Sequence, residues 1–81
     1  MKIPRDIGAE DLISLLRRYG YQSTRETGSH IRLTTAVNGE HHITIPSHKP
    51  LRVGTLHAIL KDVADHLNID WRAFAQQLFG E

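Results

Sequence analysis

The stretch GSHIRLTTAVNGEHHITIP, residues 28–46, decides the fold of this chain. On both sides of Asn38-Gly39, isoleucine or leucine alternates with polar residues. Such alternation is typical of strands that are buried on one face, and Asn-Gly is a strong hairpin signal. The stretch therefore predicts two antiparallel strands, preceded by a turn at Gly28 and ended by Pro46. We expect the apolar face of these strands to carry Ile31, Leu33, Ile43 and Ile45, and the polar face to carry His30, Arg32, His42 and Thr44.

The flanking segments predict one more strand and three helices. Apolar residues recur at helical spacing over residues 12–19, 56–67 and 71–79, and residues 21–27 are compatible with a strand. Asp70 is a suitable N-cap for the last helix. The order helix, three strands, helix, helix indicates an α+β fold. In this fold, helices cover one face of a three-stranded antiparallel sheet and leave the other face open.

Length and composition predict a single domain over residues 1–81, because 81 residues leave room for only one modest core. The sequence has no cysteine, which excludes disulfides and thiolate zinc sites. No apolar run approaches the roughly 20 residues that span a bilayer, and the N-terminus lacks the apolar segment of a signal peptide. We therefore expect a soluble, cytoplasmic protein that does not contact membranes.

The distribution of charge is more informative than the net charge of +1, which does not by itself indicate a nucleic-acid-binding protein. Lys49, Arg52 and Lys61 lie in and after a loop that leads into the second predicted helix. A helix start beside a basic loop offers N–H groups and cations to phosphate. We expect these three residues to contact phosphate, with a solvated helix surface as the alternative for Lys61.

Three motifs of this chain resemble the HicA/YcfA family of toxins. The run RETGSHIRL, residues 25–33, is similar to a strand motif of that family, and HITIP, residues 42–46, is similar to its third strand. Residues 48–61, which contain GTLHAILK, resemble its loop and second helix. The resemblance covers about residues 8–79, and the two motifs Gly-Ser-His and Gly-Thr-Leu-x-x-Ile-Leu-Lys are specific as a pair.

The resemblance implies a double-stranded-RNA-binding-like fold, α-β-β-β-α, with an extra C-terminal helix. It also implies an mRNA interferase, an endoribonuclease toxin that cleaves RNA without a metal or other cofactor. Its catalytic residue would be the histidine of the second strand, which is His30 here, and a HicB-like antitoxin would cover the surface around it. Together with the basic residues at the predicted helix start, the residues that we expect to bind RNA are Gly28, Ser29, Arg32, Lys49, Arg52, Thr55 and Lys61.

Histidine also suits this chemistry on physical grounds. RNA carries its own nucleophile, the 2′-hydroxyl, and an imidazole with an ordinary pKa of about 6.5 accepts or donates a proton near neutral pH. Whether His30 acts as acid or base stays open. So does the direction of Arg25, which flanks the turn but shares the parity of the apolar Tyr21. His42 is a candidate accessory proton donor, although a surface pair of His41 and His42 explains both residues more simply.

Other chemistries find less support in the sequence. It has six histidines but no His-x-x-x-His pair and no cysteine ligand, so we expect no dedicated metal site. Asp62 and His66, one helical turn apart, are expected to form an ordinary surface pair. The serines lack a Gly-x-Ser-x-Gly motif, which argues against a serine hydrolase. Two alternative functions stay open, a non-catalytic RNA-binding module and a protein-interaction module of the same fold.

Overall fold

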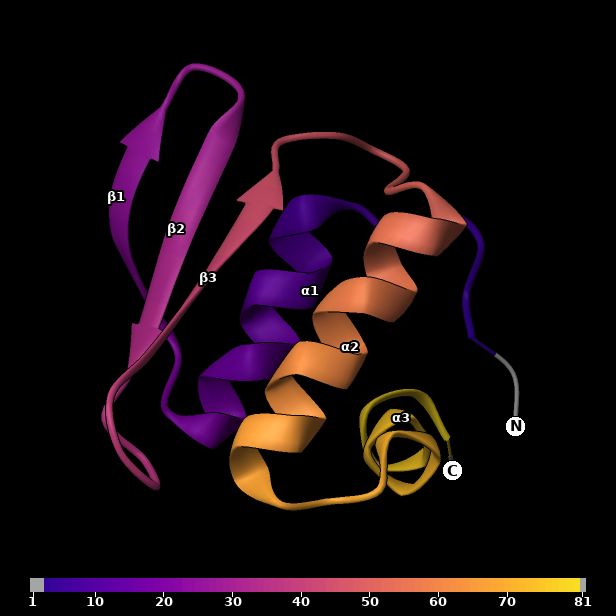
Figure 1. Cartoon of the computed structure of the whole chain (residues 1–81). Helices are drawn as coiled ribbons and strands as arrows, with labels where there is room; N and C mark the ends of the chain where they lie inside the picture. The colour runs from indigo at the N-terminus through magenta and orange to yellow at the C-terminus, as the bar shows by residue number, and fades with distance from the viewer. Residues whose placement is uncertain (1–2, 81) are drawn as a thin grey trace.

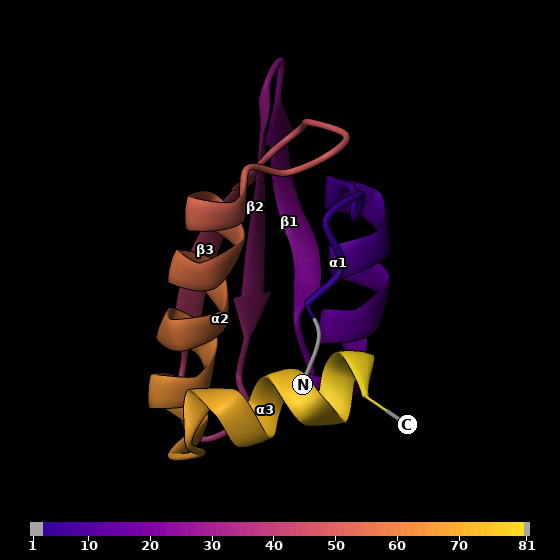
Figure 2. The same cartoon turned by 90° about the vertical axis from the view of Figure 1, so that its right-hand side faces the viewer.

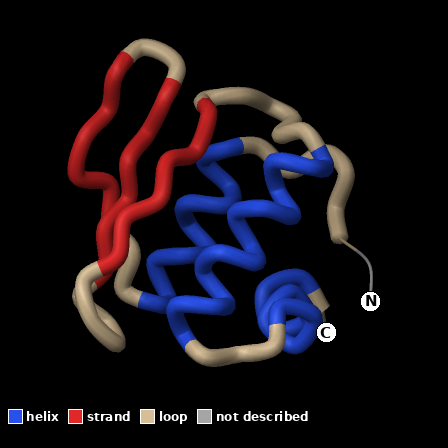
Figure 3. Tube along the Cα trace, in the orientation of Figure 1, coloured by secondary structure: helices blue, strands red, loops and turns tan. Residues whose placement is uncertain are grey.

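The structure, a computed structural model, describes residues 3–80. Its element order and its three-stranded antiparallel sheet confirm the predicted α+β fold (Figures 1 and 3). A short 3-10 helix, η1, continues the first helix. The helical elements are α1 (Ala9–Leu16), η1 (Arg17–Tyr19), α2 (Val53–Leu67) and α3 (Trp71–Phe79), and the strands are β1 (Gln22–Thr27), β2 (His30–Thr35) and β3 (His41–Pro46).

The helices lie against one face of the sheet. α1 and α2 run side by side on that face, and α3 crosses their C-terminal ends (Figures 1 and 2). Phe74 of α3 packs edge-to-face on Tyr19, with the ring centroids 5.0 Å apart. The Tyr19 hydroxyl donates to Gln77 Oε1 at 2.9 Å. The other face of the sheet carries no helix within residues 3–80, so its side chains are open to solvent and to ligands (Figure 1).

Strands β2 and β3 carry the two faces that the alternation predicts. Leu33 and Ile45 are fully buried, whereas His30, Arg32 and Thr44 are exposed. The polar face of β2 and β3 is therefore the open face of the sheet, and the prediction is confirmed.

A β-bulge in β1 decides the direction of Arg25. The register shifts between Ser23 and Arg25, and Arg25 pairs with Arg32. The extra residue, Thr24, reverses the parity of the strand. Arg25 therefore lies on the open face opposite Arg32, although Tyr21 is buried in the core.

Local sequence explains two helix ends. Gly20 follows η1 with a φ of 85°, a left-handed conformation that favours glycine. A Cβ at Gly20 would also lie only 2.6 Å from Val37 Cγ2. The carboxylate of Asp70 accepts hydrogen bonds from the N–H groups of Arg72, at 3.1 Å, and Ala73, at 3.2 Å. Asp70 is thus the N-cap of α3, as predicted.

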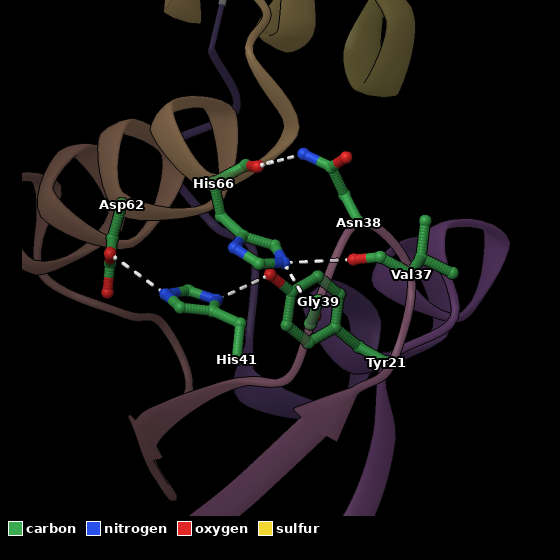
Figure 4. A network of polar contacts seen from close by, with 7 residues as sticks. All are labelled: Tyr21, Val37, Asn38, Gly39, His41, Asp62 and His66. Atoms are coloured by element: carbon green, nitrogen blue, oxygen red, sulfur yellow. Dashed lines mark hydrogen bonds and ion pairs between the residues drawn. The ribbon is translucent and has the colours of Figure 1, made fainter.

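A polar network joins β3 to α2 at the end of the sheet away from Gly28 (Figure 4). His41 Nε2 lies 3.1 Å from Asp62 Oδ1, and His41 Nδ1 lies 2.7 Å from the hydroxyl oxygen of Tyr21. Because a carboxylate only accepts, His41 donates from Nε2 to Asp62, and its Nδ1 shares a hydrogen bond with the Tyr21 hydroxyl. Burial, and after it the charge of Asp62, raise the pKa of Tyr21 to about 12. The predicted surface position of His41 is wrong, because this network holds the side chain half-buried.

His66 of α2 completes this network. Its ring stacks on that of His41, with the centroids 4.3 Å apart. Its Nε2 donates to the carbonyl oxygens of Val37, at 2.9 Å, and Gly39, at 3.0 Å, which fixes the β2–β3 loop to the end of α2. The expected surface pair of Asp62 and His66 is replaced by contacts of both residues with His41.

Candidate functional site

His30 is the first residue of β2 and follows the two-residue turn of Gly28 and Ser29. Gly28 has a φ of +29°, which glycine adopts at no steric cost. The His30 imidazole is exposed on the open face, and its Nδ1 lies 3.1 Å from Ser29 Oγ. This contact orients the ring and leaves Nε2 available to a ligand.

A hollow of about 280 Å³ lies where His30 meets the end of β3 and the start of α2, and we call it the helix-start hollow. It brings together two imidazoles, one guanidinium and one hydroxyl above a small apolar wall. Guanidinium groups bind phosphate oxygens, and imidazoles transfer protons near neutral pH. The hollow therefore suits a phosphate-containing ligand. It is lined by His30, Pro46, His48, Leu51, Arg52 and Thr55.

Main-chain hydrogen bonds fix the loop between β3 and α2 on two sides. The Ser47 N–H donates to the carbonyl of Ser29 at 2.7 Å. The carbonyl of His48 accepts from the N–H of Ala9, in the first turn of α1, at 3.0 Å. The backbone of His48 is thus held between the turn that precedes His30 and the start of α1.

A second hollow, of about 310 Å³, lies on the open face beside His30, and we call it the sheet-face hollow. Arg25 and Arg32 face each other across β1 and β2 in this hollow. Like charges directly opposite each other destabilise a sheet. No carboxylate within residues 3–80 forms an ion pair with either arginine, so a bound anion would relieve their repulsion. The hollow is lined by Arg25, Thr27, His30, Arg32 and Thr44.

The structure brings most of the residues predicted to bind RNA around His30. They either line one of the two hollows or form the turn before β2. These residues are Gly28, Ser29, Arg32, Arg52 and Thr55.

The two predicted lysines lie elsewhere. The aliphatic stem of Lys49 packs on Gly8, on the α1 side of the loop, where a Cβ on Gly8 would lie 3.0 Å from Lys49 Cγ. Lys61 lies on the α3 side of α2, with its Nζ 5.3 Å from the ring centroid of Trp71. Neither lysine lines a hollow with His30. Contact of Lys49 with RNA stays a prediction, and for Lys61 we favour the alternative, a solvated helix surface.

His42, the predicted accessory donor, lies far from His30 along the sheet. Its Nδ1 is 2.8 Å from Thr34 Oγ1 and its Nε2 is 2.7 Å from Glu40 Oε2. It pairs with Thr34, four residues beyond His30, which corresponds to about 13 Å along a strand. His42 lines neither hollow, and this position does not support a role in proton transfer at His30.

Sequence reasoning missed His48 as a residue of the site. His30 pairs with Pro46, so the loop after β3 begins beside the start of β2. His48 follows Pro46 by two residues, and this short spacing in the sequence could have identified it as a neighbour of His30.

Residues 3–80 contain neither a metal-binding cluster nor a membrane-spanning helix. No group of three or more histidine, cysteine, aspartate or glutamate side chains there is arranged to hold a metal ion. No helix in that range has the length and apolar character needed to cross a membrane.

The fold and the site define a small α+β protein with an oriented histidine and flanking arginines on an open sheet face. A family model described as HicA toxin of bacterial toxin-antitoxin matches residues 9–64, more than half of the chain. The chain therefore belongs to the HicA toxin family, whose systems pair a toxin with an antitoxin. Searches of curated proteins and of solved structures find no match.

Proposed function

We propose that this HicA-family protein is an mRNA interferase, a metal-independent endoribonuclease that serves as the toxin of a type II HicA–HicB system. His30 transfers a proton during the cleavage of RNA. The observation that carries the proposal is the position of His30. Its exposed imidazole is oriented by Ser29 and lies between two hollows that contain arginines.

The chemistry of RNA cleavage matches the groups around His30. The 2′-hydroxyl attacks the adjacent phosphorus, so the protein must remove a proton from this hydroxyl, protonate the leaving 5′-oxygen and stabilise charge on the phosphate. Nε2 of His30 suits one of the two proton transfers, because Ser29 occupies Nδ1. The neighbouring guanidinium groups suit the stabilisation of charge.

Cations on both sides of His30 fit an enzyme that cuts within a strand. Arg25 and Arg32 line the sheet-face hollow, and Arg52 lines the helix-start hollow. A nucleotide chain that crosses His30 would bring successive phosphates to these groups. This distribution favours an extended RNA strand over a single nucleotide.

The open face of the sheet is also the expected surface for the antitoxin. Its polar side chains are exposed, and no helix within residues 3–80 covers them (Figure 1). A HicB-like antitoxin bound there would exclude RNA from His30. We expect both proteins to act in the cytoplasm, where the mRNA substrate is found.

Induced expression in a bacterial host without an antitoxin tests this proposal. We expect the wild type to stop growth and to degrade mRNA, and His30→Ala, at equal protein level, to do neither. His57→Ala is the matched control, because its ring packs against Trp71, with centroids 5.5 Å apart, and it lines neither hollow. His57→Ala should behave as the wild type.

Equal growth and intact mRNA in all three strains would contradict the proposal. Purified wild type that binds RNA without cleaving it would favour the non-catalytic RNA-binding module. No RNA affinity even at low salt, where phosphate contacts are strongest, would favour the protein-interaction module.

A further inference from the structure

We propose that His48 is the second proton-transfer residue of this site and acts with His30 on opposite sides of the scissile phosphodiester linkage. This inference rests on the proposed ribonuclease function. Efficient cleavage needs a base for the 2′-hydroxyl and an acid for the 5′-oxygen. At the start of the step a single imidazole is either neutral, and suited to be the base, or protonated, and suited to be the acid. A second group near His30 is therefore required for both transfers to occur in one step.

The geometry of the helix-start hollow supplies this second group. His30 and His48 line the same hollow, although they come from different segments of the chain. The pairing of His30 with Pro46 places the loop of His48 beside the start of β2. Hydrogen bonds from Ser47 N–H to the Ser29 carbonyl and from Ala9 N–H to the His48 carbonyl hold this loop in place. Held groups of this kind lower the cost of reaching a reactive geometry.

The other four histidines have protein partners outside this hollow. His41 and His66 stack on each other in the network at the far end of the sheet. His42 contacts the side chains of Thr34 and Glu40, and the His57 ring lies against Trp71. Among the six histidines, His48 is thus the one that shares a hollow with His30.

The charged groups around His48 come from three segments. Arg52, the N-cap residue of α2, lines the same hollow. Glu10, Asp11 and Lys49 line the neighbouring hollow on the α1 side of His48. Of these groups, Arg52 shares the hollow with both histidines and is positioned to bind the phosphate. The protons move meanwhile at the 2′- and 5′-oxygens on either side of the phosphorus.

The proposed step exchanges protons between the two histidines and the RNA. A neutral imidazole removes the proton of the 2′-hydroxyl, and the freed oxygen forms a bond to phosphorus. The bond from phosphorus to the 5′-oxygen breaks, and the protonated imidazole of the other histidine gives its proton to this oxygen. The products are a 2′,3′-cyclic phosphate and a 5′-hydroxyl, and the two histidines end with exchanged protonation states.

Single-turnover cleavage by the purified full chain tests the role of His48. The substrate is a short RNA that contains a cleavage site mapped with the wild type. We expect His48→Ala to lower the rate by about 10²-fold or more, the usual contribution of one acid or base. RNA affinity and the thermal midpoint should stay close to those of the wild type, and His57→Ala should cleave at the wild-type rate.

The dependence of the rate on pH separates proton transfer from a structural role. The wild type should show a bell-shaped profile, in which one limb requires the base and the other requires the acid. His48→Ala, whose residual cleavage stays measurable, should lose one of these limbs and keep the other.

A modified RNA assigns the two roles. Sulfur in place of the 5′-bridging oxygen leaves as a thiolate without needing a proton. Of His30→Ala and His48→Ala, the variant that lacks the acid should regain most of the wild-type rate on this RNA, and the other should not.

Three outcomes would overturn the inference. A His48→Ala variant as fast as the wild type, beside an inactive His30→Ala, would remove His48 from the chemistry and leave the proposed function intact. A slow His48→Ala that keeps both limbs of the pH profile would restrict His48 to holding RNA or the loop. A folded wild type that cleaves no RNA would overturn the proposed function and this inference together.

Discussion

At the scale of single residues, Ser29 and His30 form one unit. Ser29 Oγ lies 3.1 Å from His30 Nδ1, and the backbone of Ser29 is held in turn by the Ser47 N–H. A hydrogen bond to one ring nitrogen restricts rotation of the imidazole and presents the other nitrogen to the ligand. Ser29, predicted from the sequence to bind RNA, is in our account a positioning residue for His30.

Removal of the Ser29 hydroxyl tests this role. We expect Ser29→Ala to lower the cleavage rate about 2- to 10-fold, the value of one ordinary hydrogen bond, without weakening RNA binding. Ser29→Thr keeps the hydroxyl and should retain most of the rate. Loss of RNA affinity in Ser29→Ala at an unchanged maximal rate would show instead that the hydroxyl contacts RNA.

Tyr21 should make the stability of the fold depend on pH in the alkaline range. Burial raises the pKa of Tyr21 from 10.0 to about 12 in the folded protein. Between these pH values the unfolded chain has lost a proton that the folded chain keeps, so the stabilisation present below pH 10 is lost as the pH rises toward 12. The free energy of unfolding of the wild type should therefore fall more steeply over this window than that of Tyr21→Phe. Denaturant titrations at several pH values measure this, and parallel curves for the two proteins would contradict it.

At the scale of elements, regular patterns were predictable and irregular ones were not. Period-two alternation identified β2, β3 and their open face, because one buried face requires it. The bulge at Thr24 reverses the direction of Arg25, and no pattern in residues 21–27 marks it. The loop that carries His48 takes its position from main-chain hydrogen bonds to distant segments, which local sequence does not encode. The strand residues of the candidate site and Arg52 were therefore predicted, whereas His48 of this loop was missed.

Arg52 and Lys61 belong to one basic stretch of the sequence, but the structure places them at different sites along α2. Arg52 precedes the helix and lines the helix-start hollow, whereas Lys61 lies over Trp71 on the α3 side. The basic stretch therefore does not form one patch, because Arg52 lies at the start of α2 and Lys61 lies against Trp71 of α3.

The salt dependence of RNA binding distinguishes these two cations. In a His30→Ala background, which prevents cleavage, Arg52→Gln should reduce the slope of log affinity against log salt by about 0.7, the value of one phosphate contact to a single strand. Lys61→Gln should leave the slope unchanged. A smaller slope for Lys61→Gln, with no change for Arg52→Gln, would place the RNA on the α3 side of α2.

At the scale of the whole molecule, the two ends of the sheet differ in character. At one end, Tyr21, His41, Asp62 and His66 are joined to one another and to the β2–β3 loop, which fixes β3 on α2 (Figure 4). At the other end, His30 and His48 face hollows that open to solvent. Both ends use histidine, so residue type alone does not separate a structural site from a candidate catalytic one. The contacts that each imidazole ring makes separate the two kinds of site.

The fold as a whole was predictable from composition and periodicity, whereas the chemistry was predicted only from the resemblance of the motifs to the HicA/YcfA family. Composition and periodicity gave the element order and the open face, but they left His30 as one polar residue among several. The family match over residues 9–64 shows that the chain belongs to a toxin family. The two hollows beside His30 distinguish it from the other polar residues of the open face.

The most direct test of the central claim is the analysis of RNA ends after incubation with the purified protein and a metal chelator. We predict that the wild type cleaves RNA under these conditions and leaves 2′,3′-cyclic phosphate and 5′-hydroxyl ends, and that His30→Ala leaves the RNA intact. No cleavage by the folded wild type, or equal cleavage by His30→Ala, would contradict it.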